Sequence, residues 1–147
     1  MRFQSTQASC GPAALRNALL VRGVERSEEE LAALCGYKPS NGTSAKGMMR
    51  ALILVAKEHP GLMPAVLAES RGDVAILRLM AAHRAGIVGV LLVDNWEHWV
   101  VSFGTLGEAT VHVSDSDDTE LVKHYSLEQL ERRWRGAGRK PYYGILI

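Results

Sequence analysis

The sequence predicts a single α+β domain, with a helical N-terminal half packed against a mainly antiparallel β-sheet. Apolar residues recur with helical spacing up to about residue 85. From about residue 86 the pattern changes to β-branched runs and to alternating apolar and polar residues. A chain of 147 residues is long enough for one hydrophobic core. We therefore expect one domain over 1–147, with a helical half at about 1–85, a sheet half at about 86–147 and a cleft between them.

Four helices are expected in the first half. They cover Cys10–Val21, the segment SEEELAALCG, and about 45–58 and 74–84. Ser27 and Glu30 have the spacing of a capping box at the start of the second helix. Asp73 is the expected N-cap of the fourth. Glycines follow the first, second and fourth helices, as is typical of helix ends.

Strands are expected in the second half. They cover 87–93, 98–103, 108–115 and the C-terminal segment YYGILI. The segment SLEQLERRW, which lies before the last strand, is expected to be a helix with a capping box formed by Ser126 and Gln129.

Composition excludes several classes of function. Hydrophobic residues make up 47% of the chain, charged residues 22%, and the net charge is +1, as in an ordinary globular protein. No apolar run approaches the ~20 residues of a membrane span. One cationic cluster, which we interpret as a solvated helix face and tail, consists of Arg132, Arg133, Arg135, Arg139 and Lys140. We therefore expect no nucleic-acid partner and no membrane span.

Cys10 is the candidate nucleophile because it is expected at the N-terminus of the first helix. The positive end of the helix and its unpaired backbone N–H groups favour a thiolate there. The Cys10 N–H can also stabilise an oxyanion, and Gln4 can add a side-chain amide donor if residues 4–9 form a tight loop. Cys35, at the C-terminal end of the second helix, is interpreted as a packing residue. Two cysteines make no disulfide framework, so a reducing, cytoplasmic location is expected.

His98 is the candidate general base and Asp115 its partner. If residues 105–108 form a four-residue hairpin turn, each residue i faces residue 213 − i, which places His98 opposite Asp115. The carboxylate would then fix the tautomer of the imidazole and stabilise its charged form. A shift of two residues in this register would favour Asp117 instead.

The other histidines are weaker candidates. His59, His83 and His124 are interpreted as surface residues, and His112 points away from Asp115 in the predicted strand. No CxxC pair and no helical pair of histidines is present, so neither a metal site nor a cofactor is expected.

Three sequence blocks resemble those of the papain-like, bacteriocin-processing peptidases, which cut after double-glycine leaders. The blocks are QSTQASCGPAAL, HWVVS and VHVSD, and the resemblance extends over nearly the whole chain. It implies a papain-like fold, with Cys10 as nucleophile, Gln4 as oxyanion-hole residue, His98 as base and Asp115 as orienting acid. Ser116 follows Asp115 where the family usually has proline.

The expected activity is hydrolysis of a peptide bond, after small or glycine residues, in a peptide or protein substrate. An isopeptidase, amidase or acyl-transferring enzyme with the same triad is an alternative. A non-catalytic module that binds a peptide in the same cleft is a second one.

Overall fold

The computed structural model describes residues 1–107 and 109–147. The elements in chain order are α1 (Cys10–Val21), α2 (Glu28–Cys35), α3 (Ala45–Glu58), β1 (Ala65–Glu69), α4 (Gly72–Arg84), β2 (Gly89–Val93), the short helix η1 (Asp94–Trp96), β3 (His98–Leu106), β4 (Thr110–Ser114), β5 (Val122–Ser126), α5 (Leu127–Trp134) and β6 (Tyr142–Leu146). The predicted α+β class is confirmed.

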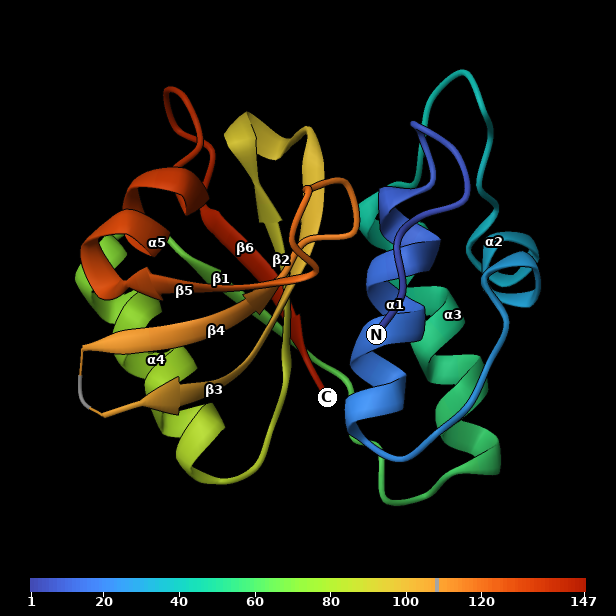
Figure 1. Ribbon diagram of the computed structural model, residues 1–147, viewed down its shortest axis with the longest axis horizontal. Helices are drawn as coiled ribbons and strands as arrows, with labels where there is room; N and C mark the ends of the chain where they lie inside the picture. The colour runs from blue at the N-terminus through green and yellow to red at the C-terminus, as the bar shows by residue number, and fades with distance from the viewer. Residues whose placement is uncertain (108) are drawn as a thin grey trace.

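The strands form one antiparallel sheet of six strands between two layers of helices (Figure 1). Its order is β1-β6-β2-β3-β4-β5. Helices α1, α2 and α3 lie on one side of the sheet, with α2 packed outside against α1 and α3, and α4 and α5 lie on the other side. Alternate residues of β3 enter the two cores, with Trp99 packing toward α1 and Val100 toward α4 and α5. The sheet therefore has a buried core on each face.

The helices begin and end largely where the sequence predicts. Ser27 caps α2 by accepting a hydrogen bond from the Glu30 N–H, and Ser126 and Gln129 form the complete capping box of α5. Helix α4 starts slightly earlier than expected, with Arg71 at its N-cap position and Asp73 in its first turn. No helix in the described ranges is long and apolar enough to cross a membrane.

The division into halves differs from the expected one, because β1 and α4 belong to the sheet side of the molecule. Strand β1 pairs with the C-terminal strand β6, and α4 packs beside α5. Only Leu67 of β1 is fully buried, so its sequence lacks the alternation that marks a strand. Strand β5, also unexpected, is an edge strand with no fully buried residue. Strand β1 is thus defined by pairing with a strand far along the chain, whereas β5 pairs with β4, the strand that precedes it.

The β3–β4 hairpin has a register different from the predicted one. Val101 faces Ser114 and Ser102 faces Val113, which is a shift of two residues. A bulge follows between Ser102 and Thr105. The predicted turn at 105–108 includes residue 108, which lies outside the described residues.

Candidate active site

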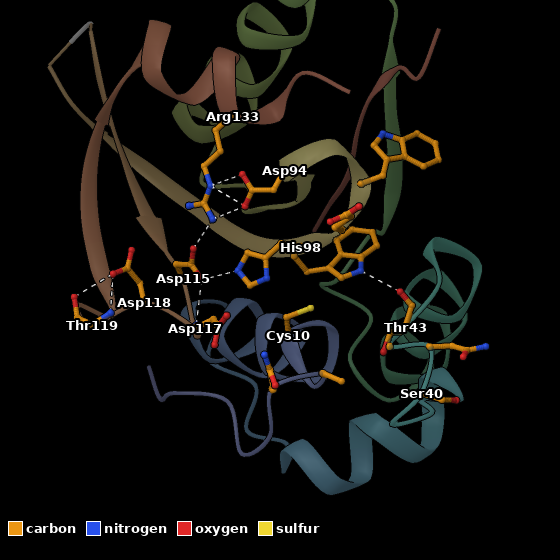
Figure 2. Close-up of a pocket in the computed structure, with 17 residues that line it drawn as sticks. Cys10, Ser40, Thr43, Asp94, His98, Asp115, Asp117, Asp118, Thr119 and Arg133 are labelled. Carbon is orange, nitrogen blue, oxygen red and sulfur yellow. Dashed lines mark hydrogen bonds and ion pairs between the residues drawn. The ribbon is translucent and has the colours of Figure 1, made fainter. Parts of the chain in front are cut away.

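Cys10, His98 and Asp115 meet in one cavity of about 850 Å³. Cys10 begins α1, His98 begins β3, and Asp115 directly follows β4. Figure 2 shows the His98 ring between the Asp115 carboxylate and the Cys10 side chain. The cavity thus lies where the N-terminus of α1 meets the end of the sheet.

Cys10 occupies a helix start whose backbone N–H groups are not capped by a side chain. Ser9 stands at the N-cap position, but its hydroxyl bonds back to the Thr6 carbonyl instead of reaching into the helix. The Cys10 side chain is largely buried, with 9% of the residue exposed. The positive end of α1 therefore points at the thiol of a largely buried cysteine.

His98 and Asp115 form the hydrogen-bonded pair that the sequence predicts. His98 Nε2 lies 2.6 Å from Asp115 Oδ1, and the two side chains are 14% and 5% exposed. Burial opposes the imidazolium, but the hydrogen bond with Asp115 and the interaction with Cys10 outweigh it and raise the pKa of His98 to about 10. Because Nε2 is engaged with Asp115, Nδ1 is the nitrogen left for Cys10.

Asp115 meets His98 although the predicted register is wrong. The shift of two residues keeps Asp115 on the same face of the sheet as His98, because strand side chains alternate with a period of two. If β4 continued as an extended strand, Asp117 would lie directly opposite His98. The strand ends at Ser114, however, and the turn that follows removes Asp117 from that line. Asp115 therefore reaches the imidazole diagonally.

Arg133 is a site residue that the sequence analysis missed. Its Nη2 donates to Asp115 Oδ2 at 2.7 Å and to Asp94 Oδ2 at 2.8 Å. Burial raises the pKa of the Asp115 carboxyl, but hydrogen bonds from His98 and Arg133 hold it well below its usual range. Among its helical neighbours, Arg132 is solvent-exposed, as the cationic cluster was expected to be, whereas the Arg133 side chain is only 21% exposed. The sequence signal that could have identified it is its helical spacing, because Arg133 lies three positions after the apolar Leu130 and so near the inward face of α5.

Gln4 lies beside the cavity and is absent from its lining. Its Nε2 donates to the Gln7 carbonyl at 3.0 Å and to Asp117 Oδ1 at 3.1 Å, and the Ser116 hydroxyl donates to its Oε1. The loop that carries Gln4 is held by Glu28, whose carboxylate accepts from the Ser5 N–H and hydroxyl. The expected tight loop is therefore present, and the amide of Gln4 is fully hydrogen-bonded within the protein.

The opposite wall of the cavity comes from the loop before α3 and from two tryptophans. Trp99 Nε1 donates to the Thr43 carbonyl at 3.1 Å, which ties this loop to β3. Trp96 Nε1 donates to the Pro141 carbonyl. Besides Cys10, His98 and Asp115, the lining includes the acidic residues Asp94, Glu97, Asp117 and Asp118. Arg133, which pairs with Asp94 and Asp115, is the arginine in this lining and does not balance its five carboxylates. The cavity lining therefore carries excess negative charge.

The remaining candidates lie outside the cavity. His83, interpreted from sequence as a surface residue, is instead partly buried, with its Nε2 2.7 Å from the hydroxyl of the fully buried Ser102. Burial lowers the pKa of His83. Cys35 is 3% exposed, and burial raises the pKa of its thiol, as fits a packing residue. The described residues contain no group of three side chains that could hold a metal ion.

Comparison with known proteins identifies structural relatives only. No protein-family model and no curated protein sequence matches the chain. The peptidase domain of Streptococcus ComA, a bifunctional ABC transporter of a quorum-sensing pathway, superposes with a TM-score of 0.70 at 19% identity, covering 99% of this chain and 95% of that one. A double-glycine-motif protease from an AMS/PCAT transporter, solved with its leader peptide, gives 0.69 at 17% identity, covering 97% and 86%.

A third structure, described as a C39-like peptidase from Bacillus anthracis, gives a TM-score of 0.67 at 15% identity, covering 99% of this chain and 92% of that one. All three similarities extend over nearly the whole chain. The resemblance indicated by the three sequence blocks is thus confirmed at the level of structure, and the chain has the papain-like fold of the double-glycine peptidase domains.

Proposed function

We propose that the protein is a cysteine peptidase that hydrolyses a peptide bond with Cys10 as nucleophile, His98 as general base and acid, and Asp115 as the acid that orients His98. One observation carries this proposal: the His98–Asp115 pair, at 2.6 Å, shares a cavity with a cysteine at a helix N-terminus. A thiolate beside an imidazolium is the reactive form of a cysteine nucleophile. The activity requires no cofactor.

The reaction proceeds in two steps. The Cys10 thiolate attacks the carbonyl carbon and forms a C–S bond, and the carbonyl oxygen becomes an oxyanion that the Cys10 N–H and a Gln4 amide N–H stabilise. The C–N bond then breaks, and the amine leaves with the proton of the His98 imidazolium. In the second step His98 takes a proton from water, the resulting hydroxide attacks the thioester, and the C–S bond breaks to release the acid.

We expect the substrate to be a peptide with a small, glycine-like residue on the acyl side of the cleaved bond. Trp96 and Trp99 both line the cavity next to His98, which narrows the space for side chains there. The structural relative solved with its leader peptide is a double-glycine-motif protease, which supports the same preference. A cytoplasmic, reducing location would keep Cys10 as the free thiol that this chemistry needs. A peptide library in which glycine is not favoured at that position would contradict the preference.

Alkylation by iodoacetamide tests the nucleophile without knowledge of the substrate. Each cysteine is followed by peptide mass between pH 4 and 9, in the wild type and in His98→Ala. We expect Cys10 to react quickly below pH 7, Cys35 to react slowly at every pH, and the advantage of Cys10 to disappear in His98→Ala. If Cys10 behaves as a free thiol near pH 8.5 in both proteins, the proposal is wrong.

Peptide cleavage is the second test. We expect Cys10→Ala to abolish turnover of any peptide that the wild type cleaves, while Cys35→Ala retains it. Appreciable turnover by Cys10→Ala would exclude the mechanism. An added amine that appears in the product would indicate acyl transfer in place of hydrolysis.

A further inference from the structure

Arg133 holds the carboxylate that orients the candidate base. The two oxygens of Asp115 have separate partners: Oδ1 accepts from His98 and from the Asp117 N–H, whereas Oδ2 accepts from Arg133. With 5% of its side chain exposed, Asp115 has little access to water that could replace the arginine. The guanidinium therefore prevents the carboxylate from rotating away from the imidazole.

The same arginine holds the turn that leads into His98. Asp94, Asn95 and Trp96 all have left-handed backbone angles, with φ of 51°, 60° and 72°. Each such residue costs about 1–2 kcal/mol unless its surroundings compensate. Arg133 Nε donates to Asp94 Oδ1 at 3.0 Å, at the start of this strained turn, and His98 follows two residues after the turn ends.

Arg133 is itself well ordered by its neighbours. Its Nη1 donates to the Tyr125 hydroxyl at 3.1 Å, and the guanidinium carbon lies 5.9 Å from the centre of the Tyr125 ring. It thus projects from α5 with every nitrogen hydrogen-bonded and links three segments, namely the turn before β3, the end of β4 and the end of β5. Figure 2 shows Arg133, Asp115, His98 and Cys10 following one another across the cavity.

We infer that Arg133 is a positioning residue, which sets the geometry of the His98–Asp115 pair by clamping Asp115 and the Asp94 turn at once. This inference rests on the proposed function for its catalytic meaning, but the geometry can be tested without a substrate. Lysine cannot replace arginine here, because a single ammonium group lacks the planar fork that reaches both carboxylates.

If Arg133 acted only through its charge, its removal would change the pKa of His98 in the opposite direction from a loss of positioning. A cation that shares Asp115 with His98 repels the imidazolium, so its removal would raise the pKa of His98 if Asp115 stayed in place. If Arg133 positions Asp115, removing it lets the carboxylate turn away and lowers the pKa of His98. The direction of this change separates the two roles.

The experiment compares Arg133→Gln, Arg133→Lys and the matched control Arg132→Gln, whose arginine is exposed on the same helix. The pKa of His98 is measured by NMR titration of the imidazole, and the fold is checked by circular dichroism. We expect the pKa of His98 to fall by about one unit or more in both Arg133 variants and to stay unchanged in the control. An unchanged or higher pKa of His98 in a folded Arg133→Gln overturns the inference.

Asp94→Asn covers the case in which Arg133→Gln does not fold. This variant weakens the contact with the turn and leaves Asp115 and Arg133 intact, and we expect a smaller fall in the pKa of His98. An unchanged pKa in both Asp94→Asn and Arg133→Lys overturns the inference as well. On a cleaved peptide, kcat of Arg133→Lys should fall by up to about 100-fold with little change in KM. If no peptide is cleaved but the pKa of His98 falls as expected, the peptidase proposal fails while the positioning role stands.

Discussion

The side-chain amide of Gln4 donates one of its two hydrogens to Asp117 Oδ1, at 3.1 Å, and the other to the Gln7 carbonyl, at 3.0 Å. The two acceptors at Nε2 fix the orientation of the amide. The Ser116 hydroxyl, which donates to Oε1, is consistent with the same orientation. An amide with both hydrogens engaged has none left for an oxyanion. Gln4 must therefore release one partner before it can stabilise the tetrahedral intermediate.

Asp117→Ala should increase turnover, because it frees one Gln4 N–H and removes a negative charge near the developing oxyanion. An oxyanion-hole donor contributes about 100-fold or more to kcat, so a partial gain of about tenfold is expected. The steady-state kcat on a cleaved peptide measures it. Asp118→Ala is the control, since Asp118 also lines the cavity but pairs with Lys123. A loss of kcat in Asp117→Ala would mean that Asp117 orients Gln4 productively.

The His98–Asp115 pair should make stability depend on pH. Burial opposes the imidazolium, but the hydrogen bond with Asp115, together with the interaction with Cys10, raises the pKa of His98 from its ordinary 6.5 to about 10. The folded protein therefore binds this proton more tightly than the unfolded chain, and the resulting stabilisation is complete below pH 6.5 and lost as the pH rises through about 10. We expect the urea midpoint of the wild type to fall over this range more than that of Asp115→Asn. Parallel curves for the two proteins would contradict this expectation.

Trp99→Phe should weaken substrate binding more than catalysis. The substitution keeps most of the buried ring but removes the hydrogen bond to the Thr43 carbonyl, which costs about 1 kcal/mol and frees the loop on that wall of the cavity. We expect KM to rise with a smaller change in kcat. Trp134→Phe is the matched control, because Trp134 is equally buried and donates to the Tyr143 carbonyl away from the cavity. Equal changes in KM in both variants would indicate a general loss of packing.

Gly11→Ala should disturb the start of α1. A Cβ at Gly11 would lie 2.7 Å from Thr43 Cβ and 2.8 Å from its Oγ1, so either the helix or the loop must move. Overpacking of this kind costs about 1–3 kcal/mol, and the displacement would also slow the alkylation of Cys10. Urea unfolding and the alkylation rate report the two effects. Gly61→Ala, where nothing lies within 4 Å, should change neither.

Local patterns predicted the helices well and the strands unevenly. The capping boxes and helix-ending glycines depend on residues three or four positions apart. Helix α2 begins and ends where these signals place it, and α5 begins at its predicted capping box. Strand β1 was missed because its place between α3 and α4 is defined by pairing with β6, about 80 residues further along the chain. A five-residue segment with one fully buried side chain contains no local pattern that could predict this partner.

Local sequence patterns are enough to identify the residue types of the site and the face on which they lie. A cysteine at a helix start is visible in the sequence as a candidate nucleophile. The alternation along β3 and β4 places His98 and Asp115 on one face, and a register shift of two residues leaves them there. Long-range packing selects Asp115 over Asp117 as the partner of His98. It also brings Arg133 to both Asp115 and Asp94, and Gln4 to Asp117. These contacts join segments far apart in the chain, and they depend on where β4 ends and how α5 packs, which no local propensity encodes.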